Sequence, residues 1–261
     1  MTERPLRGVA VLVTRPATQA AELVQAIEAA GGSAILFPVI RIEVRPAEAI
    51  RDEMQRLPNP DIVIFISRNA VQHGLAYHAP GAARIAAIGP STRNAIEQAG
   101  YAVDIAAVDG FDSEQLLATA ELQEVAGKSV RIVRGSAGRD LLATELALRG
   151  ARVDYLSVYE RLAVTHSAAE MLHLRDLWQA GGIHRVTIMS VESFNNLWSI
   201  LPVEGRQLLQ CTPLVTPSRR VIQAVNDKIP GSPATLAAGP QAADMLRALI
   251  AATAPGTRHE A

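Results

Sequence analysis

Short apolar runs rich in Val and Ile recur along the chain, and segments with a helical spacing of apolar residues stand between most of them. The runs lie at residues 9–14, 34–44, 61–67, 84–89, 129–135, 152–160 and 185–190. Apolar strands that alternate with helices are typical of parallel sheets, which are buried on both faces. The pattern therefore predicts an α/β fold.

The ends of the expected helices carry the residues that start and stop helices. Predicted helix starts follow the strands at Pro16, Ser91, Ser136 and Ser193. Predicted helix stops fall at Gly31, Gly100 and Gly150. Each strand is thus expected to deliver its carboxyl end to the start of a helix.

An internal repeat becomes visible when residues 11–40 are laid on residues 130–159 without a gap. The alignment sets Arg15 on Arg134 and Gly31 on Gly150. Two further matches follow in the same order along the chain, Ser67 with Ser190 and then Pro90-Ser91 with Pro217-Ser218. Chance agreement between small apolar residues could give part of this similarity. The order of three matched units favours duplication of one α/β domain.

If the repeated halves are equivalent domains, one domain is inserted into the other. We expect residues 1–41 plus 162–261 to form the first domain and residues 44–159 the second. Residues 37–44 and 155–162 occupy equivalent places and are expected to join the domains as a two-stranded β-ladder. The sequence thus predicts two similar parallel-sheet α/β domains with a cleft between them.

The balance of charge limits the classes of partner. Lys+Arg 25 and Asp+Glu 26 give a formal net charge of −1, which favours neither nucleic acid nor an acidic membrane surface. Any anion must therefore be held locally. All the cationic residues except Lys128 and Lys228 are arginines, the better side chain for bidentate carboxylate contacts. A coding bias toward arginine is the alternative explanation.

Cysteine content and terminal segments bear on the compartment. Cys211 is the single cysteine and cannot form an intramolecular disulfide, and no cysteine–histidine cluster has metal-ligand spacing. The first apolar run, residues 9–13, is too short for a signal peptide, and no segment has the length of a membrane-spanning helix. We expect a cytoplasmic protein without a metal, with a frayed tail at residues 251–261.

Polar turns follow the predicted strands, at the sheet edge where α/β proteins bind ligands and helix N-termini present unpaired N–H groups. The turns contain Thr14, Arg15 and Pro16; Ser67, Arg68 and Asn69; Gly89, Pro90, Ser91 and Thr92; Arg134, Gly135 and Ser136; Ser190 and Ser193; and Thr216 and Ser218. Each hydroxyl could simply cap its own helix. Together, around one cleft, they suit an elongated ligand that carries many carboxylates.

Several other kinds of site lack their motifs. The loop RGSAGRD at residues 134–140 resembles a phosphate cradle but lacks the Gly-Lys-Ser/Thr ending, and no GxGxxG follows a strand. The interpretation as a nucleotide-binding enzyme is therefore supported by this loop alone. The six histidines show no arrangement for a nucleophilic triad, and GxSxG is absent, so hydrolase chemistry is disfavoured.

One tyrosine in the predicted ladder is a candidate for catalysis. Tyr155 and Tyr159 are four residues apart, so in a regular strand they lie on the same face. A phenol at this place can donate a proton to a departing hydroxyl, although packing is the commoner role of a tyrosine in an apolar strand.

Six segments together resemble the uroporphyrinogen-III synthase family. They are VLVTRP, FPVIRIE, FISRNAV, AIGPSTRNAIEQAGY, GFDSEQLL and VRGSAGRDLLATELALRGARVDYLSVYER, and they extend over nearly the whole chain. The resemblance implies two α/β lobes of flavodoxin-like type, joined by a two-stranded ladder, with the active site in the cleft. This implied fold agrees with the topology drawn from the repeat.

The resemblance implies a cofactor-free lyase of tetrapyrrole biosynthesis that acts as a monomer on a polycarboxylate tetrapyrrole. Linear hydroxymethylbilane, with eight carboxylates, is cyclised to uroporphyrinogen III with loss of water. Ring A loses its hydroxyl to give an azafulvene, which attacks ring D and forms a spiro intermediate, and reclosure inverts that ring. Without the enzyme the bilane closes to the I isomer.

The resemblance assigns Tyr159 as the catalytic residue that assists departure of the hydroxyl. The expected substrate-binding residues are Arg15, Ser67, Arg68, Asn69, Gly89, Ser91, Thr92, Arg134, Gly135, Ser136, Ser190, Ser193 and Ser218. Arg134 could instead neutralise Asp140. In the first lobe TPSRR and MSVES depart from the family pattern, and these departures support the rival interpretation, a non-catalytic two-lobed protein that binds a tetrapyrrole or another polyanion.

Overall fold

The computed structural model describes residues 4–78, 83–107, 112–138 and 140–253. The chain divides into two compact units. Unit 1 comprises residues 1–41 and 162–261, and unit 2 comprises residues 42–161. Both passages between the units lie within strands, β3 (Ile40–Val44) and β8 (Arg152–Ala163).

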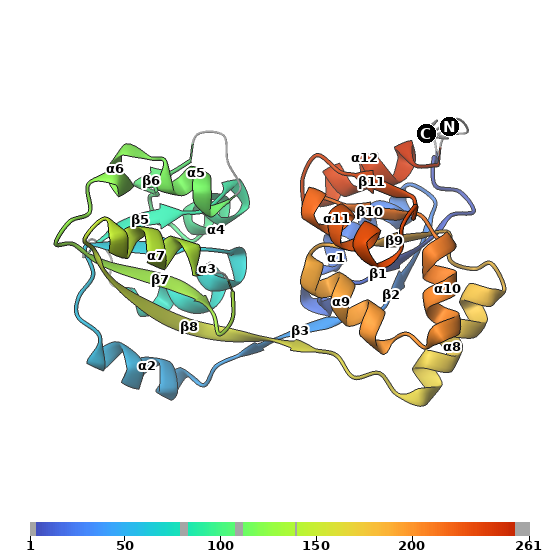
Figure 1. The fold of residues 1–261 in the computed structure, drawn as a ribbon, viewed down its shortest axis with the longest axis horizontal. Helices are drawn as coiled ribbons and strands as arrows, with labels where there is room; N and C mark the ends of the chain where they lie inside the picture. The colour runs from blue at the N-terminus through green and yellow to red at the C-terminus, as the bar shows by residue number, and fades with distance from the viewer. Residues whose placement is uncertain (1–3, 79–82, 108–111, 139, 254–261) are drawn as a thin grey trace. The chain divides into compact units, whose positions relative to one another are not determined.

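Unit 1 contains a parallel sheet with the order β11-β10-β9-β1-β2. Its strands are β1 (Ala10–Val13), β2 (Ser33–Leu36), β9 (Arg185–Thr187), β10 (Leu214–Thr216) and β11 (Ala234–Leu236). Its helices are η1 (Ala17–Gln19), α1 (Ala21–Ala29), α8 (Ala168–Gln179), α9 (Val191–Ile200), α10 (Val203–Cys211), α11 (Arg219–Lys228) and α12 (Ala242–Ala251). Figure 1 shows these elements in sequence colours.

Both faces of the central strands of the unit 1 sheet are buried. On one face, Val11 and Val13 of β1 pack with the apolar sides of α1 and α12. Leu12 and Leu214 are fully buried as well, and Leu12 points to the opposite face because side chains alternate along a strand. The continuous apolar runs of the sequence therefore reflect strands covered on both sides.

Unit 2 contains a sheet with the order β3-β8-β7-β4-β5-β6. Besides β3 and β8, its strands are β4 (Ile62–Phe65), β5 (Arg84–Ala87), β6 (Ile105–Ala106) and β7 (Ser129–Gly135). Its helices are α2 (Ala47–Arg56), α3 (Arg68–Gly74), η2 (Leu75–Tyr77), α4 (Pro90–Gln98), α5 (Ser113–Leu117), α6 (Ala120–Gln123) and α7 (Leu141–Leu148). The five strands from β8 to β6 are parallel.

The edge strand β3 pairs with β8 in the opposite direction. The N–H of Arg45 donates to the carbonyl of Val158 at 3.1 Å, and the N–H of Val164 donates to that of Val39 at 3.3 Å. A rising residue number in one strand thus meets a falling number in the other, which is the antiparallel pattern. This pair is the predicted two-stranded ladder.

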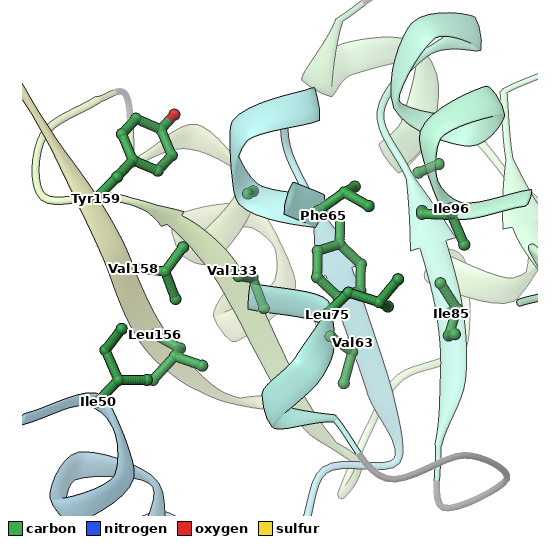
Figure 2. Close-up of a cluster of buried hydrophobic side chains, with 13 residues drawn as sticks. Ile50, Val63, Phe65, Leu75, Ile85, Ile96, Val133, Leu156, Val158 and Tyr159 are labelled. Atoms are coloured by element: carbon green, nitrogen blue, oxygen red, sulfur yellow. The ribbon is translucent and has the colours of Figure 1, made fainter. Parts of the chain in front are cut away.

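Helices cover both faces of the unit 2 sheet. One face holds a cluster in which Val63 and Phe65 of β4 and Val133 of β7 pack with Ile50 of α2 and Ile96 of α4 (Figure 2). The opposite face holds a second cluster, contributed by the intervening strand residues and by α5, α6 and α7. Unit 2 is therefore a three-layer α/β/α unit.

The two sheets share one strand order. Under the sequence repeat, β1 and β2 correspond to β7 and β8, and β9, β10 and β11 correspond to β4, β5 and β6. With these equivalences both sheets follow the flavodoxin-like order 2-1-3-4-5, and β3 is added at the edge of the second sheet. The predicted fold class, two similar parallel α/β domains joined by a ladder, is confirmed.

Some local predictions need correction. The run at residues 34–44 is not one strand, because Pro38 has no N–H for a ladder and separates β2 from β3. Ser136 does not start a helix; α7 begins after Asp140. The tail expected at residues 251–261 begins with the last residue of α12, and the amides of Ala252 and Thr253 still donate to helix carbonyls. Residues 254–261 lie outside the described part.

Candidate active site

Each sheet has one point at which the direction of chain progression reverses, and ligands of open α/β sheets bind outside the carboxyl ends of the strands there. In unit 2 this point lies between β7 and β4, and in unit 1 between β1 and β9. The turns that follow these four strands contain Ser136, Ser67, Arg15 and Ser190. Four of the predicted binding residues therefore stand at the switch points of their own sheets.

Tyr159 lies in the strand next to the unit 2 switch point, and its hydroxyl contacts Ser67. The two oxygens are 3.1 Å apart, and either hydroxyl can donate. Ser67 also caps α3, because its Oγ accepts a hydrogen bond of 3.1 Å from the N–H of Ala70. The phenol is thus held next to the N-terminus of α3, where backbone N–H groups and the helix dipole favour negative charge.

The side on which Tyr159 lies is set by an irregularity in β8. In the β7–β8 ladder Arg134 pairs with Ser157 but Gly135 pairs with Tyr159, so Val158 is an extra residue. Such a β-bulge disturbs the alternation of side chains. Val158 and Tyr159 consequently enter the same core cluster, on the same side of the strand as Leu156 (Figure 2).

The expectation that Tyr155 and Tyr159 share a face was therefore wrong. Tyr155 packs against the opposite cluster, with the side chains that contact α5, α6 and α7. The bulge at Val158 reverses the alternation between the two tyrosines. Only Tyr159 points to the face that carries Ser67 and α3.

Gly135 lies directly against the Tyr159 ring. A Cβ built on Gly135 would come within 2.8 Å of Cε2 and 3.0 Å of Cζ of the ring. The next amide, the N–H of Ser136, donates to the carbonyl of Tyr159 at 2.9 Å. These two predicted binding residues thus contact the catalytic candidate, and the Ser136 side chain itself is exposed.

Arg134 belongs to a polar cluster on the other face of β8. Its Nη1 donates to Oδ1 of Asp140 at 3.0 Å, and the Tyr155 hydroxyl donates to the same oxygen at 3.0 Å. The guanidinium lies 4.6 Å from the centre of the Tyr155 ring, and only 5% of Arg134 is exposed. The ion pair that the sequence suggested as the alternative role of Arg134 is present.

These contacts predict how Asp140 titrates. Hydrogen bonds from Arg134 and then from Tyr155 lower the pKa of the Asp140 carboxyl below its ordinary value. A pKa that is lower in the folded than in the unfolded state stabilises the fold above the unfolded value, and this stabilisation is lost as the pH falls through the folded value. We expect Arg134→Met to raise the pKa of Asp140 more than Tyr155→Phe does, measured by carboxyl NMR titration. An unchanged pKa in Arg134→Met would contradict the described ion pair.

The remaining predicted residues of unit 2 lie at two helix starts. Arg68 is exposed and Asn69 is partly buried in the first turn of α3. Gly89 precedes α4, and its carbonyl accepts a hydrogen bond of 3.0 Å from the N–H of Thr92, which is buried. Ser91 lies in the same turn and is partly buried. β4 and β5 are adjacent, so the two helix starts lie at neighbouring strand ends.

Of the predicted binding residues of unit 1, Arg15, Ser190 and Ser193 form hydrogen bonds within the unit itself. Arg15 is 5% exposed, and its Nη2 donates to the carbonyl of Pro240. Ser190 caps α9 by accepting from the N–H of Ser193 at 3.1 Å, and the two hydroxyl oxygens are 2.9 Å apart. Ser218 precedes α11 without a side-chain capping bond. The capping role that the sequence left open is thus present at Ser190 and not at Ser218.

The sequence did not single out His73, which lies near Tyr159. The centres of the two rings are 6.4 Å apart. Burial lowers the pKa of His73 below its ordinary value, because desolvation disfavours the charged imidazolium. The sequence does contain a signal for His73, because this residue lies on α3, six residues after the Ser67 cap.

Two further observations concern the described residues only. Among them, no group of three or more His, Cys, Asp or Glu side chains could hold a metal ion. No helix in this part of the chain is both long and apolar enough to cross a membrane.

Comparisons with known proteins agree on one family. The family model described as Uroporphyrinogen-III synthase HemD matches residues 21–249. The uroporphyrinogen-III synthase of Salmonella typhimurium is 34% identical over 227 residues, which cover 80% of this chain and 87% of the relative. That of Escherichia coli is 33% identical over 220 residues, with the same coverage.

Solved structures show the same fold. A mutant uroporphyrinogen III synthase from Thermus thermophilus gives a TM-score of 0.64 at 20% identity, covering 94% of this chain and 98% of that one. The enzyme from Helicobacter pylori gives a TM-score of 0.60 at 12% identity, covering 94% and 99%. By the family match and the identity to its bacterial relatives, the chain belongs to the uroporphyrinogen-III synthase family.

Proposed function

We propose that this protein is a uroporphyrinogen-III synthase, a cyclising lyase of tetrapyrrole biosynthesis that works without a cofactor. The observation that carries the proposal is its family membership, established over residues 21–249. Its substrate is linear hydroxymethylbilane, and its product is uroporphyrinogen III. Loss of water, formation of a spiro intermediate and inversion of ring D connect the two.

Tyr159 is the proposed proton donor in the first step. The phenol O–H gives its proton to the hydroxyl of the bilane, the carbon–oxygen bond breaks, and water leaves with both bonding electrons. The phenolate that forms is the base that can later recover a proton from the pyrrole. Ser67, 3.1 Å from the phenol oxygen, can donate to it once it is negatively charged. Proton transfer by a positioned side chain accelerates such reactions by roughly 100- to 10,000-fold.

The carboxylates of the substrate are proposed to bind the strand-end turns of each unit. In unit 2 the exposed Arg68 offers a cation at the start of α3, and the start of α4 adds the positive end of a helix dipole. In unit 1 the partly buried Ser218 begins α11, where Arg219 and Arg220 are exposed. Such binding orients the reacting ends of the bilane, and orientation can contribute roughly 7 to 11 kcal/mol to a barrier.

Three further properties complete the proposal. Unit 1 and unit 2 are the two domains of the enzyme, with boundaries close to those expected from the repeat. The protein works in the cytoplasm, which is consistent with its single, unpaired Cys211. It acts as a monomer on a small-molecule substrate, without a nucleic-acid or membrane partner.

Complementation tests the proposed function in cells. In an Escherichia coli strain without its own uroporphyrinogen-III synthase, expression of this protein is expected to restore growth in the absence of added haem. The matched sample expresses Tyr159→Phe at the same level and is expected to grow poorly. If folded, wild-type protein accumulates and growth still depends on added haem, the proposed activity is wrong and the binding-protein interpretation gains support.

A comparison of Ser67 with Ser190, which caps a helix in the same way, distinguishes the structural role of Ser67 from its catalytic role. Ser67 and Ser190 cap α3 and α9 with bonds of the same length, 3.1 Å, but only Ser67 contacts Tyr159. We expect Ser67→Ala and Ser190→Ala each to lower the free energy of unfolding by about 1 kcal/mol. Ser67→Ala is also expected to lower kcat by about 2- to 10-fold, the worth of one hydrogen bond. Urea unfolding and steady-state kinetics of both variants check this, and a larger kcat loss in Ser190→Ala would be inconsistent with it.

A further inference from the structure

Arg45 holds the irregular part of β8 from the side opposite β7. It follows directly after β3, and its backbone N–H donates to the carbonyl of Val158 at 3.1 Å. Its guanidinium donates to the carbonyl of Ser157 and, through Nη1, to Oε2 of Glu53 at 2.7 Å. One residue thus binds two successive carbonyls of the bulge, and a carboxylate of α2 orients its side chain.

The bulge lies directly before the Tyr159 side chain. Because Val158 is the extra residue, straightening the strand there would turn Tyr159 to the opposite face, away from Ser67. The extra residue of a bulge is not paired by the neighbouring strand, so without a further partner its backbone groups would form no hydrogen bonds. The contacts of Arg45 with Ser157 and Val158 therefore stabilise the conformation that directs the phenol to Ser67.

Gly135 provides the space that this conformation needs on the side of β7. The Tyr159 ring occupies the place that a Cβ of Gly135 would take, with a nearest contact of 2.8 Å. Gly135 is not among the described glycines with a positive φ, so an alanine there is not strained in its backbone. The effect of a methyl group at this position is thus displacement of the ring.

We propose that Arg45 and Gly135 are positioning residues for the reaction, which place the Tyr159 phenol by fixing the β8 bulge and by leaving room for the ring. The proposal rests on the proposed function for its kinetic consequence and on geometry alone for the position of the ring. Neither residue needs to touch the substrate. Arg45 acts through the carbonyls of Ser157 and Val158, and Gly135 acts through the ring of Tyr159.

Kinetics of Arg45→Gln and Gly135→Ala test the consequence for catalysis. Each variant is expected to lower kcat by about tenfold with little change in KM, because the proton donor is displaced while the carboxylate-binding turns remain. Matched controls are Gly205→Ala in α10 of unit 1, whose added Cβ meets Leu201 at 3.0 Å, and Arg84→Gln, which removes the 3.5 Å ion pair with Glu121. Both controls are expected to keep kcat within about twofold.

A double-mutant cycle distinguishes positioning from general destabilisation. In the Tyr159→Phe background, Arg45→Gln and Gly135→Ala are expected to cause no further loss of kcat, since the group that they position is gone. An undiminished tenfold loss in that background would overturn the proposal.

NMR of protein with 13C-labelled tyrosine rings provides a readout that is independent of activity. The chain has only four tyrosines, and the signal missing from Tyr159→Phe identifies Tyr159. This signal is expected to shift in Arg45→Gln and Gly135→Ala but not in Gly205→Ala or Arg84→Gln. If the wild-type protein has no synthase activity but the ring signal still shifts in Arg45→Gln and Gly135→Ala, the positioning is supported and the proposed function is refuted. An unmoved Tyr159 signal in both variants would refute the positioning.

Discussion

Tyr159→Phe is expected to reduce kcat for hydroxymethylbilane by about 100-fold or more. The substitution removes a single hydroxyl, so the proton for the departing water must come from solvent, and general acid catalysis of this kind is worth roughly 100- to 10,000-fold. The ring itself is 3% exposed within the unit 2 core and remains in place. KM is expected to change little, because the carboxylates of the bilane bind elsewhere.

Steady-state kinetics measures this effect and compares Tyr159→Phe with a variant that loses a different phenol hydroxyl. Tyr101→Phe is the control, since Tyr101 packs against the same core cluster but does not contact Ser67. Circular dichroism of both variants should match that of the wild type. Full turnover by Tyr159→Phe would remove Tyr159 from the mechanism and leave orientation of the substrate as the main source of catalysis.

Phe65→Ala is expected to have the largest effect on stability, lowering the free energy of unfolding by about 3 to 5 kcal/mol. Phe65 is fully buried at the end of β4, between β5 and β7, and lies at the centre of the cluster in Figure 2. Truncation there removes buried apolar area and leaves a cavity in a closely packed core. Ser67 follows two residues later, so the cap of α3 is expected to loosen as well.

Urea unfolding followed by circular dichroism measures this loss. Leu148→Ala is the control, because Leu148 is 76% exposed at the end of α7 and its truncation is expected to change the free energy of unfolding by about 0.5 kcal/mol or less. Hydrogen exchange should show faster exchange of β4 and β5 amides in Phe65→Ala. A loss below 1 kcal/mol would mean that the described core does not stabilise unit 2.

Much of the fold could be predicted from the sequence because parallel strands buried on both faces leave long apolar runs. The run at residues 129–135 became β7 without change, and the matched Gly31 and Gly150 both end helices with positive φ. The strands that escaped notice, β6 and β11, have two and three residues. So few residues do not establish a period that distinguishes a strand from a loop.

The candidate site was predictable where it depends on position along the chain. Ser67 and Ser190 could be matched through the repeat, and both cap helices at strand ends. The face of Tyr159 was not predictable, because one extra residue in β8 reverses the alternation. That bulge depends on Arg45, more than a hundred residues away in sequence, and on the absence of a side chain at Gly135. Such long-range contacts leave no local pattern in the sequence.

The partner of Arg134 could not be predicted from its residue type. An arginine at a strand end suits a carboxylate ligand, and the same guanidinium suits an aspartate six residues later in its own loop. The structure pairs it with Asp140 and stacks it on Tyr155. Which anion an arginine binds depends on the path of the loop after β7, and the sequence does not specify this path.

The isomer composition of the product shows whether the protein is a uroporphyrinogen-III synthase. Hydroxymethylbilane is generated in place by its own synthase, the purified protein is added without cofactor, and the oxidised products are separated into I and III isomers. We expect the III isomer to dominate with wild-type protein and its share to fall toward that of the uncatalysed reaction with Tyr159→Phe. Formation of the I isomer alone in the presence of folded wild-type protein would show that the protein does not direct the inversion of ring D.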